Sequence, residues 1–231
     1  MRQGGRRLKH RRVIVHIAAS ADGYIAGPGG ELEWLTSRPA PKGFYGINAF
    51  MKSVDTLLMG RETYEAGLRL GGTFDPKRRT YVFSHKEPPA NVPRGVEFVS
   101  GDVSEFVARL RERPGKDIWL MGGGELIASF LDAGAIDEFV VSVVPVFIGD
   151  GIPLIARRPR HAPLELMSSE SFEDGLVQLR YRVIGSEPPA PARGSPRARP
   201  DRRTRSAGSS SAPSPPSGGR RPASRKARRS R

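Results

Sequence analysis

Between residues 13 and 184, short runs of β-branched and aliphatic residues alternate with segments of helical periodicity, and this alternation restricts the fold more than any other feature. Strands are expected at Val13–Ala19, Thr56–Met59, Arg79–Ser84, Val96–Val99, Asp117–Met121 and Glu138–Val144. Helices are expected at Gly43–Ser53, Arg61–Gly67, from Asp102 to Pro114 and at Glu125–Ala133. Such alternation predicts an α/β fold with a mostly parallel central sheet and helices on both of its faces.

The last part of this region breaks the alternation. Two consecutive strands, Leu164–Ser171 and Leu176–Ile184, flank the turn sequence Glu173-Asp174-Gly175. The sheet is therefore expected to end in an antiparallel hairpin. Earlier in the chain, Asp102 followed by Glu105 is typical of a helix N-terminus, and Gly134 of a helix end.

The positive charge of the chain lies at its two ends. Of the net charge of +14, residues 1–12 carry +6 and residues 185–231 carry +11, whereas residues 13–184 carry −3. Residues 185–231 are rich in Pro, Ser and Arg, a composition that cannot bury enough apolar surface to fold. We therefore predict a disordered basic extension over 1–12, one folded domain over 13–184 and a disordered tail over 185–231. The tail is interpreted as a solubilising extension or as an arm that binds polyanions weakly. Its lack of aromatic residues for stacking favours the extension.

Several classes of function are disfavoured by composition. The chain has no cysteine, which excludes disulfides, Cys-ligated zinc and thiolate catalysis. Its four histidines show no metal-ligand spacing. The apolar run Val13–Ala19 is too short for a secretory signal and no run approaches a membrane span, so a cytoplasmic location is expected.

Glycine stands at two places where a predicted strand turns into a helix. The first is Gly60-Arg61-Glu62-Thr63 and the second is Gly122-Gly123-Gly124-Glu125-Leu126. Free N–H groups at a helix start favour an anion, and glycine lets a phosphate approach the backbone. Two such sites suit a ligand with separated phosphates. The alternatives are a tight turn at the triple glycine and a solvated cation at Arg61.

A third cluster follows the first strand, which is expected to be central. It comprises Ser20, Asp22-Gly23 and, further along, Trp34. Open α/β sheets bind ligands at the carboxyl ends of their strands, so this loop is a candidate for the substrate side. Ser20 and Asp22 are equally well explained as residues that hydrogen-bond within a turn.

The three clusters together carry a family resemblance. A strand into S-x-D-G-x-I-A, then M-G-R-x-T-Y, a strand ending V-F-S, and M-G-G-G-E-L, in that order, resemble the dihydrofolate-reductase-like superfamily. Within it the chain is most similar to the C-terminal reductase domain of the bifunctional riboflavin-biosynthesis deaminase–reductase and its stand-alone bacterial relatives. Residues 145–154 also resemble a proline- and glycine-bearing segment of that family.

The resemblance implies a three-layer fold and an NADPH site. Gly60, Arg61 and Thr63 match the helix start at the adenine-side phosphates, and Arg61 with Ser84, and with His85 beside it, matches the grip on the 2′-phosphate. The pyrophosphate loop and helix correspond to Gly122, Gly123, Gly124, Glu125 and Leu126.

On the substrate side, the resemblance implies hydride transfer to a small heterocycle such as a ribosylamino-pyrimidine. Ser20, Asp22, Gly23 and Trp34 match positions near nicotinamide and substrate, with Asp22 and Ser20 as the candidate catalytic pair. The chain departs from folate reductases because residues 35–54 contain no carboxylate to hold a pterin. A homodimer, formed through an exposed strand or through residues 145–154, is expected from the resemblance alone. The rival hypothesis is a nucleotide-binding protein without turnover, or one that binds nucleic acid through its tail.

Overall fold

The carboxyl ends of the parallel strands determine where ligands can bind, so the order of the strands is the central feature of the fold. In the computed structural model, which describes residues 10–38, 41 and 44–185, eight strands form one sheet in the order β5-β4-β3-β6-β1-β7-β10-β9. The six strands that precede the hairpin are β1 (Val13–Ser20), β3 (Val54–Gly60), β4 (Arg79–Phe83), β5 (Val96–Val99), β6 (Asp117–Gly122) and β7 (Glu138–Val144). All six pair in parallel, and β1 lies inside the sheet between β6 and β7, which agrees with the prediction that it is central.

The predicted hairpin closes the sheet. Its strands are β9 (Leu164–Ser171) and β10 (Val177–Val183), and β10 pairs antiparallel with both β7 and β9. Gly175 has a φ of 82°, which is the left-handed conformation that its turn requires. β9 is the outer edge, and every one of its residues is exposed. The expected homodimer stays a prediction, for which β9 is the exposed strand.

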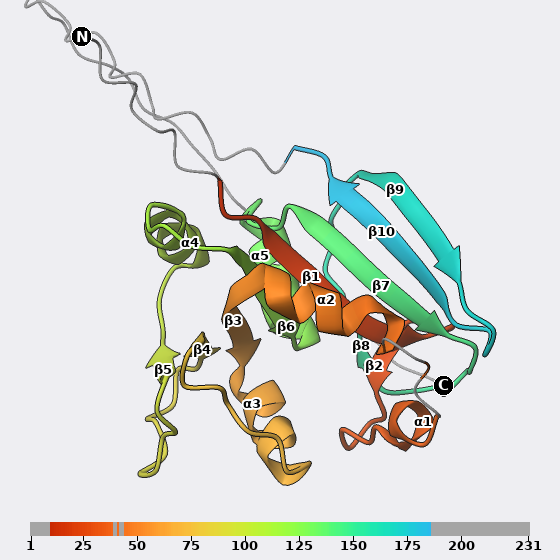
Figure 1. Cartoon of the computed structure of the whole chain (residues 1–231), viewed down its shortest axis with the longest axis horizontal. Helices are drawn as coiled ribbons and strands as arrows, with labels where there is room; N and C mark the ends of the chain where they lie inside the picture. Colours follow the sequence, from red (N-terminus) through yellow and green to blue (C-terminus); the bar gives the residue numbers. More distant parts are fainter. Residues whose placement is uncertain (1–9, 39–40, 42–43, 186–231) are drawn as a thin grey trace, which may run out of the picture. The chain divides into compact units, whose positions relative to one another are not determined.

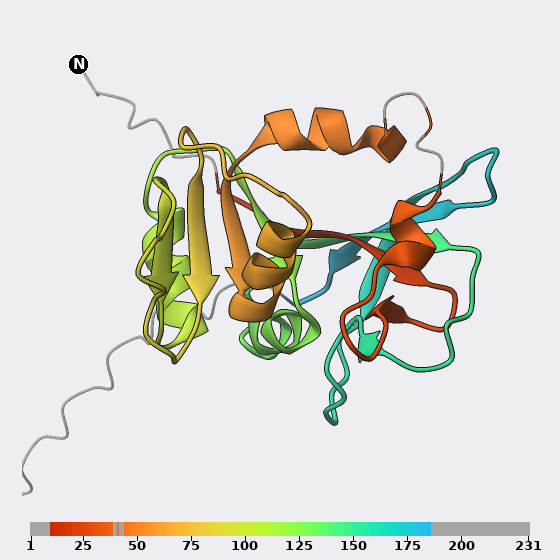
Figure 2. The ribbon, with the colours of Figure 1, turned by 90° about the horizontal axis from the view of Figure 1, so that it is seen from below.

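Helices cover both faces of the sheet, which confirms the predicted three-layer α/β fold. The helix set is α1 (Glu33–Thr36), a 3₁₀ turn η1 (Phe44–Gly46), α2 (Ile47–Ser53), α3 (Arg61–Arg69), α4 (Val103–Arg111) and α5 (Gly124–Asp132). Figure 1 gives their places along the chain, and Figure 2 shows α2 and α5 on opposite sides of the sheet. One core cluster joins α4 and α5 to Val15, Leu58 and Leu120, and a second joins α3 to Leu57 and Met59. Because adjacent residues of β3 belong to different clusters, α4 and α5 pack on the face of the sheet opposite to α3.

The α4 and α5 helices follow their sequence signals. The Asp102 side chain accepts a hydrogen bond of 2.9 Å from the Glu105 backbone N–H, so the predicted N-cap of α4 is confirmed. Val107 and Leu110 are buried beneath α4, and Ile127 and Phe130 beneath α5. Among the described residues, no helix is both long enough and apolar enough to cross a membrane.

Two predicted boundaries need correction. The helix expected over 43–53 begins only at Ile47, because Phe44 and Tyr45 both have a φ of 51° and interrupt it. Phe44 is consequently exposed. The Tyr45 hydroxyl instead donates to Asp174 of the hairpin turn at 2.5 Å, which holds the interrupted turn in place.

The second correction concerns the amino-terminal boundary. Residues 10–12, expected within a disordered extension, belong to the folded part. Arg11 is 4% exposed and donates to Asp55, Thr56 and two backbone carbonyls. Arg12 forms ion pairs with Asp117 and Glu138. Carboxylates at the start of the sheet, of which Asp117 and Glu138 are buried, therefore hold these two arginines. The remaining residues of both predicted disordered termini, 1–9 and 186–231, lie outside the described residues.

Two short strands connect distant segments near the carboxyl ends of the parallel strands. β2 (Tyr24–Ala26) pairs antiparallel with β8 (Ile152–Pro153). Neither strand was predicted, because two or three residues carry no periodicity. Their pairing places residues 145–156 beside the loop that follows β1.

Candidate active site

The two glycine turns lie side by side at the carboxyl ends of β3 and β6. Met59 and Gly122 are register partners in the parallel pair. A Cβ placed on Gly60 would lie 3.8 Å from the Gly123 nitrogen, and one on Gly123 would lie 3.6 Å from the Thr63 Oγ1. The predicted turns at 60–63 and 122–126 therefore form one continuous backbone surface.

The helices that leave these turns present free amides. No side chain of the described residues caps the start of α3 or of α5. The first N–H groups of each helix have no partner within it, and the helix dipole makes this end positive. The surface is thus suited to two negatively charged groups, one at each helix start.

The three glycines after β6 are required for different reasons. Gly122 has a φ of +124°, a conformation that L side chains rarely adopt. A Cβ on Gly124 would overlap the Pro153 carbonyl oxygen, so this glycine is required by packing. Gly123 meets only ordinary contact distances. Of the three, Gly123 is therefore the residue whose missing side chain leaves room for a ligand.

Arg61 reaches across the start of α3 towards the residues after β4. Its Nη1 donates to the Glu87 carbonyl at 2.8 Å and lies 3.5 Å from the Ser84 Oγ, while its Nε donates to Glu65 at 2.7 Å. The Ser84 hydroxyl also bonds the backbone of Lys86. The structure thus brings Arg61 and Ser84 together, and the neighbouring His85 is exposed.

The side chains of Glu125 and Leu126 point elsewhere. Glu125 forms an ion pair of 2.5 Å with Arg158, and Leu126 packs against the core. Each of these two residues can therefore offer a ligand its backbone amide but not its side chain.

The loop after β1 holds Asp22 in a hydrogen-bond network. Ser20 is buried and donates to the Asp22 carboxylate at 2.6 Å, and the backbone amides of Gly149 and Ile148 donate to the same carboxylate at 2.8 and 3.1 Å. These bonds, led by that of Ser20, lower the pKa of Asp22 below its usual value. Gly23 follows with a φ of 88°. The hydrogen bonds of Ser20 and Asp22 are thus those expected of residues that stabilise a turn, and the Asp22 carboxyl is ionised.

Trp34 lies on α1 with an unused donor. Its indole Nε1 is buried and has no hydrogen-bond partner in the described part of the chain. Buried polar groups are normally satisfied, so this donor is available to a ligand or to water.

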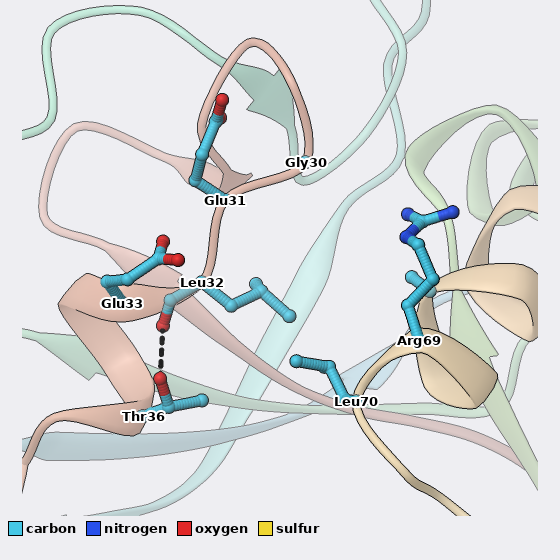
Figure 3. A pocket seen from close by; sticks show the side chains of 8 residues that line it. Gly30, Glu31, Leu32, Glu33, Thr36, Arg69 and Leu70 are labelled. Atoms are coloured by element: carbon cyan, nitrogen blue, oxygen red, sulfur yellow. Dashed lines mark hydrogen bonds between the residues drawn. The ribbon is translucent and has the colours of Figure 1, made fainter.

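A cavity of about 90 Å³ separates the segment around α1 from the end of α3 (Figure 3). Leu32 and Leu70 extend towards each other across it, with Arg69 on the α3 side and Glu31 and Glu33 on the other. The segments that follow β1 and β3 thus flank a gap with opposite charges on its two walls.

A cluster around His16 was not predicted from the sequence. On the face covered by α2, the His16 ring stacks on Phe50 with centroids 4.5 Å apart, and the Trp119 Nε1 donates to the His16 carbonyl at 3.0 Å. Burial lowers the pKa of His16 to about 4, so this ring is neutral at pH 7. Gln178 of β10 donates to Ser142 of β7 at 3.1 Å. Strand alternation alone could have placed His16 and Trp119 on one face, but their partners come from distant segments.

Comparison with known proteins agrees with this geometry. Residues 11–178 match the model of the RibD C-terminal domain. YwjB of Bacillus subtilis is 37% identical over 172 residues, which are 74% of this chain and 97% of YwjB. A crystal structure from Shewanella sp. PV-4, named for riboflavin biosynthesis, is 32% identical with a TM-score of 0.68 and covers 74% of this chain and 98% of its own.

A more distant match shows the fold. Dihydrofolate reductase from Enterococcus faecalis, solved with NADP(H), has a TM-score of 0.54 at 20% identity and covers 77% of this chain and 99% of its own. The dihydrofolate-reductase-like fold is therefore established. Because the RibD C-terminal model matches well over half of the residues, the chain belongs to the RibD C-terminal domain family.

Proposed function

We propose that the protein is an NADPH-dependent reductase that transfers hydride to a small heterocyclic substrate of the ribosylamino-pyrimidine type. The observation that carries this proposal is the pair of uncapped helix starts, at 60–63 and 122–126, on one continuous surface. Family membership supports a reductase-like role.

The chain's groups fit a phosphorylated dinucleotide. The amides at the start of α3 and at Gly123 would hold separated phosphates, and the gap at Gly123 gives the backbone access that a pyrophosphate needs. Arg61 has a planar guanidinium beside Ser84, which suits a 2′-phosphate better than a ribose hydroxyl. When bound, the cofactor supplies the hydride, and the protein supplies binding and orientation.

The substrate is assigned to the end of the rim next to β1. If the phosphates lie over β3 and β6, the reactive end of the cofactor extends towards β1, where Ser20, Gly23 and the free Trp34 donor are found. The neutral His16 and the Ser142–Gln178 pair lie on the α2 face of this end, and Arg180 is close enough to His16 for its charge to help lower the pKa of that ring. These donors and acceptors suit a polar heterocycle.

Cofactor titration tests the proposal directly. We expect NADPH to bind with enhanced cofactor fluorescence and at least about tenfold more tightly than NADH, the margin expected for one charge-assisted contact. Arg61→Gln should remove that preference while NADH binding changes little. Arg109→Gln, on the exposed surface of α4, is the control and should keep it.

Turnover is the second test. NADPH oxidation should be stoichiometric with reduction of a ribosylamino-pyrimidine or a related pyrimidine. Tight NADPH binding without oxidation across pyrimidine and pteridine substrates would contradict the reductase, and it would favour the rival nucleotide-binding protein without turnover.

A further inference from the structure

Asp22 joins two segments that are far apart in the sequence. One of its carboxylate oxygens accepts from Ser20 at 2.6 Å, and the other accepts from Gly149 at 2.8 Å. Ser20, only 2% exposed at the end of β1, also accepts from the Tyr24 amide at 3.0 Å. The carboxylate is thus held from the β1 side and in turn holds residues 148 and 149.

The segment held by Asp22 leads to the phosphate side of the proposed site. The Ala21 amide donates to the Val146 carbonyl at 2.8 Å, and the Leu154 amide donates to the Gly23 carbonyl at 2.9 Å. Two residues later, the Ala156 amide donates to the Gly124 carbonyl at 3.1 Å, at the first residue of α5. Residues 146–156 therefore form a strap from the β1 loop to the second glycine turn.

The strap has little freedom where it passes the site. The Pro153 carbonyl lies so close to Gly124 that even a Cβ there would overlap it, and a Cβ on Gly151 would overlap the Ala26 carbonyl. Close-packed backbone transmits displacement instead of absorbing it. A shift of residues 148–149 would therefore reach both the loop beside Ser20 and the amides at the start of α5.

The same contacts make Asp22 a poor carrier of protons. Three donors already engage its two oxygens, and its carboxylate is the ionised form over the physiological range. A proton relay needs a group that titrates near the working pH. Asp22 is better suited to holding geometry than to moving a proton.

We propose that Asp22 is a positioning residue, which fixes the 146–156 strap so that the β1 loop and the start of α5 present one preformed cofactor surface. This inference rests on the proposed function, because it assigns the role of Asp22 within that same site.

The experiment compares Asp22→Asn and Asp22→Ala in the full chain with Asp150→Asn. Asparagine keeps one acceptor oxygen but cannot exchange a proton, whereas alanine keeps neither property. Asp150 is the matched control, because it lies on the same strap and is exposed. Within the described part of the chain, its side chain bonds only the amide of its neighbour Gly151, at 2.8 Å. The rate of amide hydrogen exchange at residues 148–149 measures how firmly the strap is held, without any cofactor. NADPH affinity and the dependence of kcat on pH measure the effect on the proposed site.

We expect exchange at 148–149 to rise about tenfold in Asp22→Ala and less in Asp22→Asn, as loss of charge-assisted hydrogen bonds implies. NADPH affinity and kcat should fall in the same order, with the shape of the pH profile unchanged. Asp150→Asn should match the wild type.

Two results would overturn the inference. The first is exchange at 148–149 that is unchanged in Asp22→Ala. The second is equal inactivity of Asp22→Asn and Asp22→Ala with loss of one limb of the pH profile, which would assign Asp22 to proton transfer. A wild-type chain that binds no NADPH would instead refute the proposed function, and the exchange data would still decide whether Asp22 holds the strap.

Discussion

The neighbouring residues Gly123 and Gly124 are required for different reasons, the first for ligand access and the second for packing. A side chain at Gly123 meets only the Thr63 Oγ1 at 3.6 Å, whereas one at Gly124 meets the Pro153 carbonyl oxygen at overlapping distance. We therefore expect Gly124→Ala to lower the free energy of unfolding by about 3 kcal/mol, the upper range for overpacking. Gly123→Ala should change it by less than about 1 kcal/mol yet weaken NADPH binding about tenfold.

Thermal unfolding and a fluorescence titration of the two variants check this pair. Equal loss of stability in both would contradict the geometric distinction. Unimpaired NADPH binding by Gly123→Ala would remove the glycine turn from the proposed cofactor surface.

His16 makes the stability of the fold depend on pH. Desolvation is the largest cause that lowers its pKa from 6.5 to about 4, and the charge of Arg180 adds to it. Between these values the unfolded chain binds the proton and the folded chain does not, so stability falls as the pH is lowered from about 6.5 towards 4. The contribution of His16 to this loss is up to about 3 kcal/mol.

Urea unfolding of the wild type and His16→Gln at pH 7.5 and 5.0 measures the contribution of His16. On acidification, the free energy of unfolding of the wild type should fall by about 2 kcal/mol more than that of the variant, since the other titrating groups are common to both. Equal losses would show that the ring is protonated without penalty in the folded protein.

At the scale of single residues, the sequence predicted where a residue lies in the fold better than which side chains it contacts. Parallel strands end at one edge, so a common edge for Gly60 and Gly123 followed from the strand assignment, whereas their proximity depends on the pairing of β3 with β6. The ion pair of Glu125 with Arg158 and the stacking of His16 on Phe50 did not, because they depend on how residues more than thirty positions apart pack.

Among the elements, the strands of the main sheet and the helices α3, α4 and α5 were predicted, whereas α1, β2 and β8 were not. The buried strands and the helices α4 and α5 carried their own signals in apolar spacing and caps. The pairing of β2 with β8 and the break at Tyr45 exist only through tertiary contacts, such as that of Tyr45 with Asp174. These contacts help to fix the loops around the site, so the periphery of the site was the least predictable part.

The start of β1 is attached to the sheet by Arg11. This buried side chain reaches Asp55 and Thr56 of β3, and the backbone carbonyls of Leu110 and Lys116 on either side of the α4–β6 connection. We expect Arg11→Met to lower the free energy of unfolding by about 2–3 kcal/mol, because buried carbonyls would lose a charged donor.

Arg109→Met is the control for the Arg11 substitution. Arg109 pairs with Glu105 at 3.5 Å on the exposed surface of α4, where such pairs contribute less than about 1 kcal/mol. Denaturant unfolding of both variants separates the two cases. If Arg11→Met is as stable as Arg109→Met, the Arg11 side chain is dispensable for the fold.

For the whole molecule, the excess positive charge and the proposed cofactor surface lie in different parts of the chain. Residues 13–184 carry −3, whereas residues 185–231 carry +11. The proposed cofactor surface lies entirely within the first range. A positive tail attracts polyanions through counterion release, which falls steeply with salt, whereas recognition of a dinucleotide by fixed amides and Arg61 depends on geometry.

Truncation after Gly185 distinguishes these two activities. We expect the shortened chain to bind NADPH within about twofold of the full chain, because each contact proposed for the cofactor is retained. Any binding of the full chain to single-stranded or duplex nucleic acid should weaken as salt increases and be lost on truncation. Fluorescence titration and electrophoretic mobility shifts at several salt concentrations measure the two. Loss of NADPH binding on truncation would mean that the tail contributes to the site, since the two uncapped helix starts would then be insufficient to hold the cofactor.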